Sequence, residues 1–342
     1  MKIKQIWPFD LAKDHKEWIN LLNKEGLRSE KTVDFTLVIE DEKTGQIIGT
    51  GSLLDNLIKM VAIDSEFQGE GSFNSLMTEL LNEIYRRGHT SAYVYARPCA
   101  AEKFKFLGFN QLVNWNNQIV FMERSILGIE HQIDYWKKQT EHLQKPAAAI
   151  VMNANPFTLG HQYLVERASL NEKSVIVFVV SQERSLFSFK DRIAMVKLGT
   201  AHLKNVVVVP TGPYMVSTAT FPSYFLNEEM AVSKIQASID AALFSEIIAP
   251  SLNINKRYLG SEPNSEVTNL YNQVLSKELH NIETIIVPRV KNQSGVISAT
   301  QVRRYLAPHS SDLLNFEKLK ELVPQTTLNY LKELLKKKES KR

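Results

Sequence analysis

Residues 147–161 read AAAIVMNANPFTLGH, and this stretch decides the fold of the second half of the chain. The apolar run from Ala148 to Met152 predicts a buried strand, and the residues after Thr158 follow a helical pattern. The first backbone N–H groups of a helix have no partner within it and carry partial positive charge, so they favour phosphate. Gly160 lets the backbone approach a nucleotide closely. The stretch therefore predicts a phosphate-binding turn between a strand and a helix.

Further apolar runs, at residues 175–180, 206–209 and 284–287, are separated by segments of helix length. Short, continuous apolar strands that alternate with helices are typical of a parallel sheet covered on both faces. We therefore predict an α/β domain over residues 147–342, with a Rossmann-like, doubly wound parallel sheet.

A second polar stretch, residues 297–303, reads ISATQVR and is predicted to open a late helix. Ser298 and Thr300 can cap that helix and present hydroxyl groups to phosphate, while Arg303 can neutralise the charge of a triphosphate. In the first stretch, His161 can donate a hydrogen bond that stabilises a departing pyrophosphate. Each stretch follows a predicted strand, so together they indicate a nucleotide site.

The two stretches resemble the T/H-x-G-H and I-S-x-T-x-x-R motifs of the nucleotidyltransferase superfamily, with Thr158 at the first position. The resemblance implies catalytic roles for Thr158, His161 and Arg303. Lys190 and Arg192, after the second predicted strand, are either secondary phosphate ligands or a solvated helix start. The nucleotide-binding residues expected from the motifs and their surroundings are Asn153, Asn155, Pro156, Phe157, Gly160, Lys190, Arg192, Gly260, Glu262, Ile297, Ser298 and Thr300, with Glu262 near the adenosine.

Three longer strings, at residues 151–161, 217–226 and 258–263, are very similar to the citrate lyase ligases of bacteria, and this resemblance covers nearly the whole chain. It implies an AMP-forming acid-thiol ligase that joins acetate to the prosthetic-group thiol of the citrate lyase acyl carrier protein. Such a ligase uses ATP, passes through an acetyl-adenylate, releases AMP and diphosphate, and reactivates the lyase. It needs to supply position and charge stabilisation rather than a nucleophile. Magnesium is expected on the triphosphate, although no carboxylate spacing names its ligands.

Two other functions fit the same motifs. A cofactor adenylyltransferase would transfer AMP to a phosphopantetheine-type acceptor, and a nucleotide- or CoA-sensing regulatory protein would bind its ligands without turnover. Thr218, Thr220, Ser223 and Tyr224 form either a polar wall around acetate or the incoming thiol, or a hydroxyl-rich loop that satisfies its own backbone.

Residues 1–124 predict a separate α+β domain. Their apolar pattern indicates a hairpin within residues 35–54 and a strand at residues 57–63. Residues 73–84 then follow helical spacing. The charge-rich residues 125–146 predict a helical connector to the second domain.

The turn before that first-domain helix, Gln68-Gly69-Glu70-Gly71, and the later Leu107-Gly108-Phe109 resemble the acetyltransferase (GNAT) fold, in which such a loop grips the pyrophosphate of coenzyme A. Phe104 stands where many such enzymes carry a tyrosine acid, and a phenylalanine cannot protonate a departing thiolate. Acetyl transfer by this domain is therefore not expected. We hypothesise instead that it holds the carrier or the carrier's CoA-like arm; the alternative is a structural remnant. The residues expected to bind the arm are Gln68, Gly69, Gly71 and Ser72.

The composition of the chain bounds its location and partners. With 342 residues, of which 44% are apolar, the chain can bury two cores. Its single cysteine, Cys99, excludes an internal disulfide framework and fits a reducing compartment. No run approaches the length of a membrane span, and the net charge of +4 gathers largely in the C-terminal tail rather than along a nucleic-acid groove. We expect a cytoplasmic protein that binds neither nucleic acid nor membrane.

Overall fold

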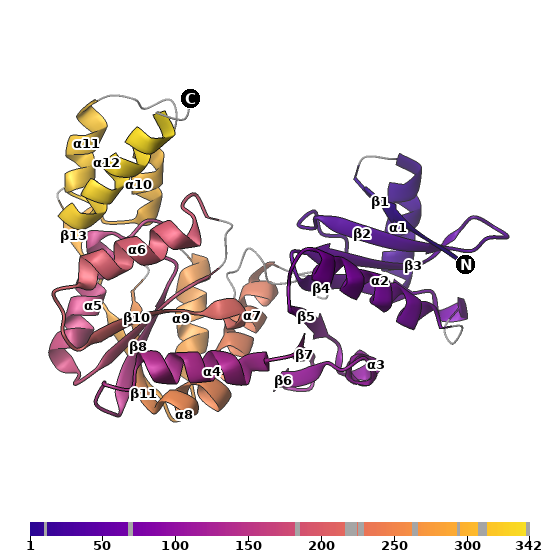
Figure 1. The fold of residues 1–342 in the computed structure, drawn as a ribbon, viewed down its shortest axis with the longest axis horizontal. Coiled ribbons are helices and arrows are strands. Elements are labelled where there is room, and N and C mark those ends of the chain that lie inside the picture. Colours follow the sequence, from indigo (N-terminus) through magenta and orange to yellow (C-terminus); the bar gives the residue numbers. More distant parts are fainter. Residues whose placement is uncertain are drawn as a thin grey trace. The chain divides into compact units, whose positions relative to one another are not determined.

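A computed structural model describes residues 1–9, 12–67, 71–181, 185–215, 224, 229–261, 266–292, 295–306 and 313–339. The first of its two units comprises Met1–Glu130 together with Thr218–Ile239, and the second comprises His131–Ser217 together with Asp240–Arg342 (Figure 1). The expected boundaries placed residues 218–239 in the second domain, whereas they cluster with the first unit. The physical reason is burial, because Tyr224 packs into a core of the first unit.

The first unit is built on a seven-stranded sheet in the order β1-β2-β3-β4-β5-β7-β6. Paired strands are antiparallel except β4 and β5, which are parallel. The predicted hairpin is β2–β3, the predicted strand is β4 and the predicted helix is α2, so the α+β fold of this unit is confirmed. The elements are β1 (Lys2–Ile6), α1 (Ala12–Lys24), β2 (Phe35–Glu40), β3 (Ile47–Leu54), β4 (Leu57–Ile63), α2 (Ser72–Arg86), β5 (Ser91–Ala96), α3 (Pro98–Phe106), β6 (Asn110–Trp115) and β7 (Ile119–Ser125).

The sheet of the first unit opens between β4 and β5. These strands pair at two positions, up to Ile58 and Val94, and then diverge. The sheet separates two cores: the one on the α2 and α3 face includes Phe104, and the one on the α1 face includes Trp18 and Tyr224. The divergence therefore leaves a gap in the sheet between the two cores.

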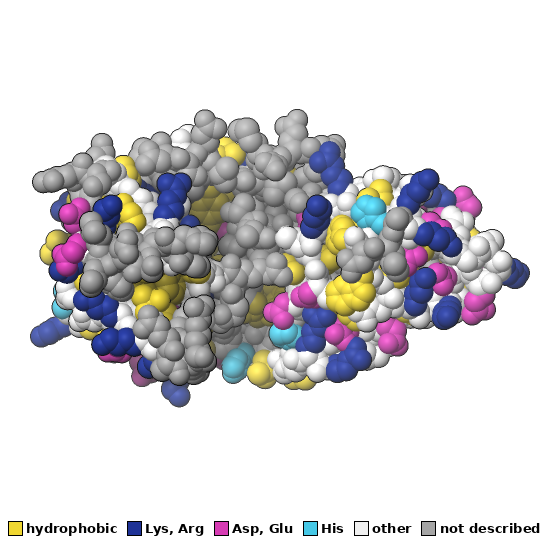
Figure 2. Space-filling view, turned by 90° about the horizontal axis from the view of Figure 1, so that it is seen from above, with side chains coloured by type: hydrophobic (Ala, Val, Ile, Leu, Met, Phe, Trp, Pro, Cys, Tyr) yellow, Lys and Arg dark blue, Asp and Glu magenta, His cyan; other side chains and the backbone are white. Residues whose placement is uncertain are grey.

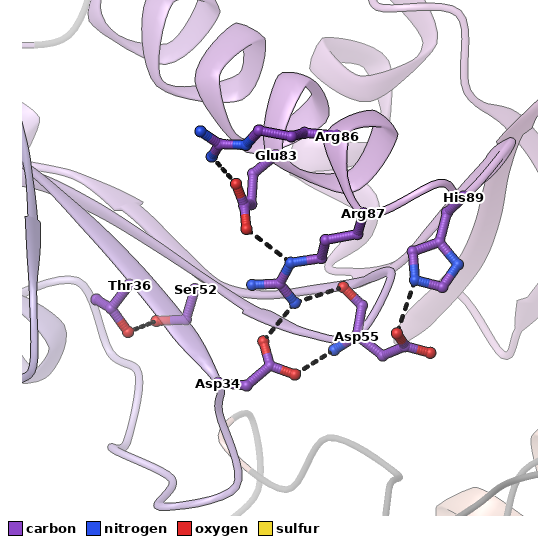
Figure 3. A network of polar contacts seen from close by, with 8 residues as sticks. All are labelled: Asp34, Thr36, Ser52, Asp55, Glu83, Arg86, Arg87 and His89. Carbon is purple, nitrogen blue, oxygen red and sulfur yellow. Dashed lines mark hydrogen bonds and ion pairs between the residues drawn. The ribbon is translucent and has the colours of Figure 1, made fainter.

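A polar network joins the C-terminal end of α2 to the loops that flank β2 and β3 (Figure 3). Arg87 Nη1 donates to the Asp34 carboxylate at 2.7 Å and to the Asp55 carbonyl at 3.2 Å. Arg87 Nε donates to Glu83 at 2.8 Å, and His89 pairs with the Asp55 carboxylate at 2.7 Å. Ion pairs that are only partly shielded from solvent stabilise a fold modestly. The network instead fixes how α2 meets the sheet.

The second unit is built on a five-stranded parallel sheet in the order β10-β9-β8-β11-β12, which confirms the doubly wound fold. The four predicted strands are β8, β9, β10 and β12, and β11 is additional because Lys256 and Arg257 interrupt its apolar pattern. The strands are β8 (Ala147–Met152), β9 (Val175–Val179), β10 (Val206–Pro210), β11 (Ile254–Gly260) and β12 (Glu283–Val287), with a short hairpin β13 (Lys291–Asn292) and β14 (Gly295–Val296). The helices of this unit are α5 (Leu159–Asn171), α6 (Phe189–Thr200), α8 (Ala249–Leu252), α9 (Glu266–Glu278), α10 (Ala299–Tyr305), α11 (Leu313–Lys320) and α12 (Gln325–Glu339). The boundaries between the two units fall within α4 (Gly128–Gln139) and α7 (Glu229–Leu243).

Helix α4 lies in the expected connector and packs against the second sheet. Trp136 is fully buried, its Nε1 donates to the Pro210 carbonyl at 2.7 Å, and its ring meets Phe178 edge-on at 5.5 Å. Val177 and Val179 belong to the core beneath α5 and α6. Because successive strand residues face opposite sides, Phe178 and Trp136 lie on the other face. Helices therefore cover both faces of the sheet.

The strand order places a ligand-binding crevice beside the predicted turn. β8 lies in the middle of the sheet, with β9 and β10 on one side and β11 and β12 on the other. In such sheets ligands bind beyond the carboxyl ends of the strands, where the order reverses. That point lies between β8 and β11, and the predicted phosphate-binding turn directly follows β8.

Among the described residues, no helix is long and apolar enough to cross a membrane. On the face drawn in Figure 2, the described Lys and Arg side chains are interspersed with Asp, Glu and apolar side chains. This part of the surface therefore differs from the basic stripe that is typical of a nucleic-acid groove.

Candidate active site

Phe157 anchors the turn between β8 and α5 in the core. It is fully buried, and its ring lies against α6 at Gly199, where any Cβ atom would collide with the ring. Ala154 adopts a positive φ of 49°, and the Asn155-Pro156 bond is cis. Phe157 was expected at the site from the sequence, whereas Gly199 was not. A glycine is unfavourable inside a helix, so its presence in α6 could have indicated a close contact. The close approach of ring and helix fixes the path of the turn.

Thr158 and His161 hold each other in a capping box at the start of α5. The Thr158 hydroxyl accepts from the His161 backbone N–H at 3.3 Å, and the Thr158 backbone N–H donates to His161 Nδ1 at 3.1 Å. The hydroxyl also lies 2.9 Å from Nδ1, and since it already accepts, its own proton is available to Nδ1. Nδ1 is therefore an acceptor, and the neutral ring carries its proton on Nε2.

His161 is neutral near pH 7. The ring is partly buried and stacks on Phe157, with the centroids 5.9 Å apart. Burial, together with the positive charge of Arg289, lowers the pKa of His161 to about 4. Nε2 thus presents an N–H donor that does not depend on protonation of the ring.

Arg289 is a site residue that the sequence analysis missed. It follows β12, and its backbone N–H and Nε donate to the Ser261 hydroxyl and carbonyl at 3.0 and 2.8 Å. Ser261 itself follows β11. Arg289 could have been predicted, because it is a basic residue just after a predicted strand. In a parallel sheet the residues that follow the strands lie at the same edge, where ligands bind.

Arg303 links the two motifs, although 148 positions separate it from Asn155. Its Nη1 donates to the Asn155 carbonyl at 2.8 Å, and its Nη2 donates to the Thr300 hydroxyl at 2.9 Å. Ser298 is the N-cap of α10, since its hydroxyl accepts from the Gln301 backbone N–H at 3.3 Å. Thr300 lies within the helix rather than at its cap, so of the two expected caps Ser298 alone fills that role.

Gly160 and Ile297 bring the backbones of the two motifs together. A Cβ atom at Gly160 would stand 3.6 Å from the Ile297 carbonyl oxygen, which is an ordinary contact distance. Protein packing therefore does not require glycine here. The missing side chain leaves room for a ligand at the start of α5.

Arg192 does not occupy the place expected of a phosphate ligand. Its side chain is fully buried, and its Nη1 donates to the carbonyls of Asn153 and Val180 at 2.9 and 2.7 Å. Its Nε donates to the Phe187 carbonyl at 3.2 Å. A fully buried guanidinium that donates to three backbone carbonyls holds the turn in position instead of presenting charge to a ligand. Lys190, at the start of α6, is exposed.

The far side of the crevice begins at Gly260, the last residue of β11. Its carbonyl accepts from Asn272 at 2.9 Å. Apart from its chain neighbours, no described residue has an atom within 4 Å of the place where a Cβ of Gly260 would stand. Glu262, the expected adenosine contact, lies outside the described residues. In the described ranges, no group of three or more His, Cys, Asp or Glu side chains is arranged to hold a metal ion.

The start of α2 in the first unit carries the residues expected to bind the arm. Gly71 is the N-cap with a φ of 76°, and no side chain among the described residues caps this helix end. Ser72 is buried, and its hydroxyl donates to the sulfur of Met1 at 3.1 Å. Gln68 and Gly69 lie outside the described residues.

Phe104 and Tyr224 line one pocket of the first unit. Phe104 is buried, and its ring meets Phe73 edge-on at 5.5 Å. The side chain of Tyr224 is buried in the α1-side core. The other residues of the expected polar wall, Thr218, Thr220 and Ser223, lie outside the described residues.

The chain is similar to known citrate lyase ligases. Residues 147–331 match the family model of the citrate lyase ligase C-terminal domain. The [citrate [pro-3S]-lyase] ligase of Klebsiella pneumoniae is 34% identical over 310 residues, which cover 88% of each chain. The chain belongs to the citrate lyase ligase family. The Escherichia coli K12 member is 34% identical over 327 residues, covering 93% of this chain and 90% of that one.

The likeness to citrate lyase ligases extends through both units, because these relatives match 88% and 93% of the chain. The C-terminal domain match of the family includes both motifs, from Thr158 to Arg303. Among solved structures, Thermotoga maritima TmcAL bound with alpha-thio ATP matches 56% of each chain with 13% identity and a TM-score of 0.37.

Proposed function

We propose that this protein is an AMP-forming acid-thiol ligase, which uses ATP to acetylate the prosthetic-group thiol of the citrate lyase acyl carrier protein and thereby activates citrate lyase. The single observation that carries the proposal is the neutral His161, locked with its proton on Nε2 at the start of α5, in a family of citrate lyase ligases. Such a donor suits a reaction in which negative charge develops on a leaving pyrophosphate.

The first step is attack by an acetate oxygen on the α-phosphorus of ATP. The new O–P bond forms as the bond to the β-phosphate oxygen breaks, which gives acetyl-adenylate and pyrophosphate. His161 Nε2–H and the guanidinium of Arg303 stabilise the charge on pyrophosphate. Thr158 acts through His161, because its hydroxyl and backbone N–H are already bonded to that residue.

In the second step the carrier thiol attacks the acetyl carbonyl carbon, the C–O bond to AMP breaks, and the thiol proton passes to solvent. No protein nucleophile is needed, so the site contributes position and charge. Arg289 adds positive charge near His161, and Arg192 holds the turn. Asn153, Asn155, Gly160, Gly260 and Glu262 surround the nucleotide in this proposal, with Lys190 at the exposed rim of the site. Magnesium is proposed to arrive on the triphosphate.

The first unit has a separate role in this proposal. Its uncapped α2 N-terminus, with Gln68, Gly69, Gly71 and Ser72, holds the carrier's CoA-like arm. Two observations support a role in binding the arm without catalysing acetyl transfer. Phe104 has no acidic group, and the backbone N–H groups that follow Gly71 have no side-chain cap among the described residues. The acetate, the carrier and a cytoplasmic location all belong to this proposal.

Acetate-dependent exchange of labelled pyrophosphate into ATP tests the ligase reaction without the carrier. We expect exchange by the wild type, a loss of roughly 100- to 1,000-fold in His161→Ala, and little change in His202→Ala. His202 is a matched control because it is an exposed histidine of the same unit, paired with Glu166.

Two other results would change the assignment. Exchange that ignores acetate but appears with phosphopantetheine would make the protein a cofactor adenylyltransferase. Tight ATP binding without exchange under any acceptor would make it a nucleotide sensor.

A further inference from the structure

A pocket of about 390 Å³ passes through the sheet of the first unit where β4 and β5 diverge. At one end its walls are Phe73 and Phe104, which belong to the α2 and α3 side. At the other end they are Leu27, Ala62 and Tyr224, which belong to the α1 side. The pocket is therefore a passage between two cores, of a volume that suits a small ligand.

Tyr224 closes the α1 end of this passage. It comes from Thr218–Ile239, which returns from the second half of the chain to the first unit. Its side chain is 3% exposed, and its carbonyl accepts from the Arg28 backbone N–H at 3.0 Å. The closing side chain is thus supplied by a segment far from the strands that form the pocket.

The Tyr224 hydroxyl is satisfied by the backbone of β4 at a bulge. Thr50 pairs with Ala62 and Ser52 pairs with Lys59, so two residues of β4, Met60 and Val61, face one residue of β3. Met60 has a positive φ of 51°. Its backbone hydrogen-bonds the phenol and acts to lower the pKa, as an N–H donated to the phenol oxygen does.

Burial outweighs that contact and raises the pKa of Tyr224 well above its usual range. The phenol therefore stays neutral, and at this end of the pocket it occupies space while its oxygen accepts the Met60 N–H of the bulge. A thioester carbonyl that entered the same end would need both that space and that donor. A buried carbonyl without a donor binds poorly.

We propose that Tyr224 makes this pocket selective for the free-thiol form of a pantetheine-like arm over the S-acetyl form. The inference rests on the proposed function, in which the first unit holds the carrier's arm. The consequence is that the arm binds before acetylation and is released after it, because Tyr224 already occupies the space and the Met60 N–H that the added acetyl group would need.

The test is calorimetric titration of the full chain with 4′-phosphopantetheine and with its S-acetyl thioester, which both lack adenosine. We expect the wild type to bind the thiol form about 10-fold or more tightly, the size of effect that one unpaired buried carbonyl produces. Tyr224→Phe keeps the ring but frees the Met60 N–H, which can then bind the thioester carbonyl. The ratio of the two affinities should therefore become smaller. Tyr224→Ala also opens space, so the two forms should bind equally well.

The control is Tyr258→Phe, which removes a buried tyrosine hydroxyl in the second unit, where it donates to Glu172 at 2.7 Å. This control should keep the wild-type ratio. The proposal is contradicted if the wild type binds the two forms equally well, or if the ratio of their affinities does not change when Tyr224 is substituted. If neither form binds the wild type, the arm-holding role itself fails. Tyr224→Phe retains the packing of the ring and decides the question even if Tyr224→Ala does not fold.

Discussion

The two helix starts that the sequence marks as phosphate-binding turns differ in what surrounds them. At the start of α5, Thr158 and His161 cap the helix and lock each other. At the start of α2, Gly71 leaves the helix end without a side-chain cap. The first arrangement presents one oriented donor for chemistry, whereas the second presents backbone N–H groups for holding a ligand. In the function that we propose, a similar local signal therefore serves catalysis in one unit and binding in the other.

The two regions also differ in the charged side chains that lie near each helix start. Around α5, Arg303 bonds the turn at Asn155, and Arg289 lies close enough to His161 to lower its pKa. The pocket beside α2 is lined by Phe104 and Tyr224. Phe104 has no ionisable group, and burial raises the pKa of Tyr224 well above its usual range. Positive charge marks the region where we place the leaving pyrophosphate, and aromatic rings mark the region where we place a thiol.

The largest effect that would test this contrast is loss of Arg303. We expect Arg303→Ala to lower the rate of pyrophosphate exchange by about 100-fold, because in the proposed reaction its guanidinium stabilises the leaving pyrophosphate. Arg304→Ala, its exposed neighbour on α10, should stay within about 2-fold of wild type because surface charges contribute little. Equal losses in the two variants would contradict a specific role for Arg303.

The pH dependence of stability tests the environment of His161. Its pKa is about 4 in the folded chain and near 6.5 when unfolded, so below pH 6.5 the unfolded state takes up a proton first. Stability from this group is intact above pH 6.5 and is lost as the pH falls towards 4. Between pH 7.5 and 5, urea unfolding should show the wild type losing about 2 kcal/mol more than His161→Gln. Parallel losses would show that the ring is solvated.

Thr158 offers a smaller and more selective change. Thr158→Ala removes the cap and one of the two donors to Nδ1, so we expect about 1 kcal/mol less stability and roughly 10-fold slower exchange. Thr158→Ser keeps the hydroxyl and should restore most of both. The measurements are thermal unfolding and the kcat of exchange. A rise in KM for ATP with unchanged kcat would point instead to direct binding of the nucleotide by Thr158.

The smallest effect concerns Gly71 in the first unit. Gly71→Ala places a side chain at a φ of 76°, and Gly45→Ala does the same at 70° in the β2–β3 turn, where nothing crowds it. Both should lose about 1 kcal/mol of stability from backbone strain. Gly71→Ala should also bind the deacetylated carrier a few-fold more weakly in titration, with exchange unchanged. If Gly45→Ala weakened the carrier equally, the α2 start would have no special role.

Much of the architecture could be predicted because it depends on local pattern. Continuous apolar strands predicted the parallel sheet, and helical spacing predicted α2. β11 could not be predicted in this way because Lys256 and Arg257 break its apolar run, while its place between β8 and β12 depends on partners far along the chain. The place of residues 218–239 likewise depends on where Tyr224 is buried.

The sequence by itself determined the chemistry of the candidate site, since the residue types around Thr158, His161 and Arg303 and their order along the chain are local facts. Tertiary structure alone decided which side chains come together at the candidate site. It buried Arg192 among backbone carbonyls, added Arg289 from the end of another strand, and set the tautomer and pKa of His161. The physical reason is that burial, hydrogen-bond partners and nearby charge arise from residues distant in sequence, which no local pattern specifies.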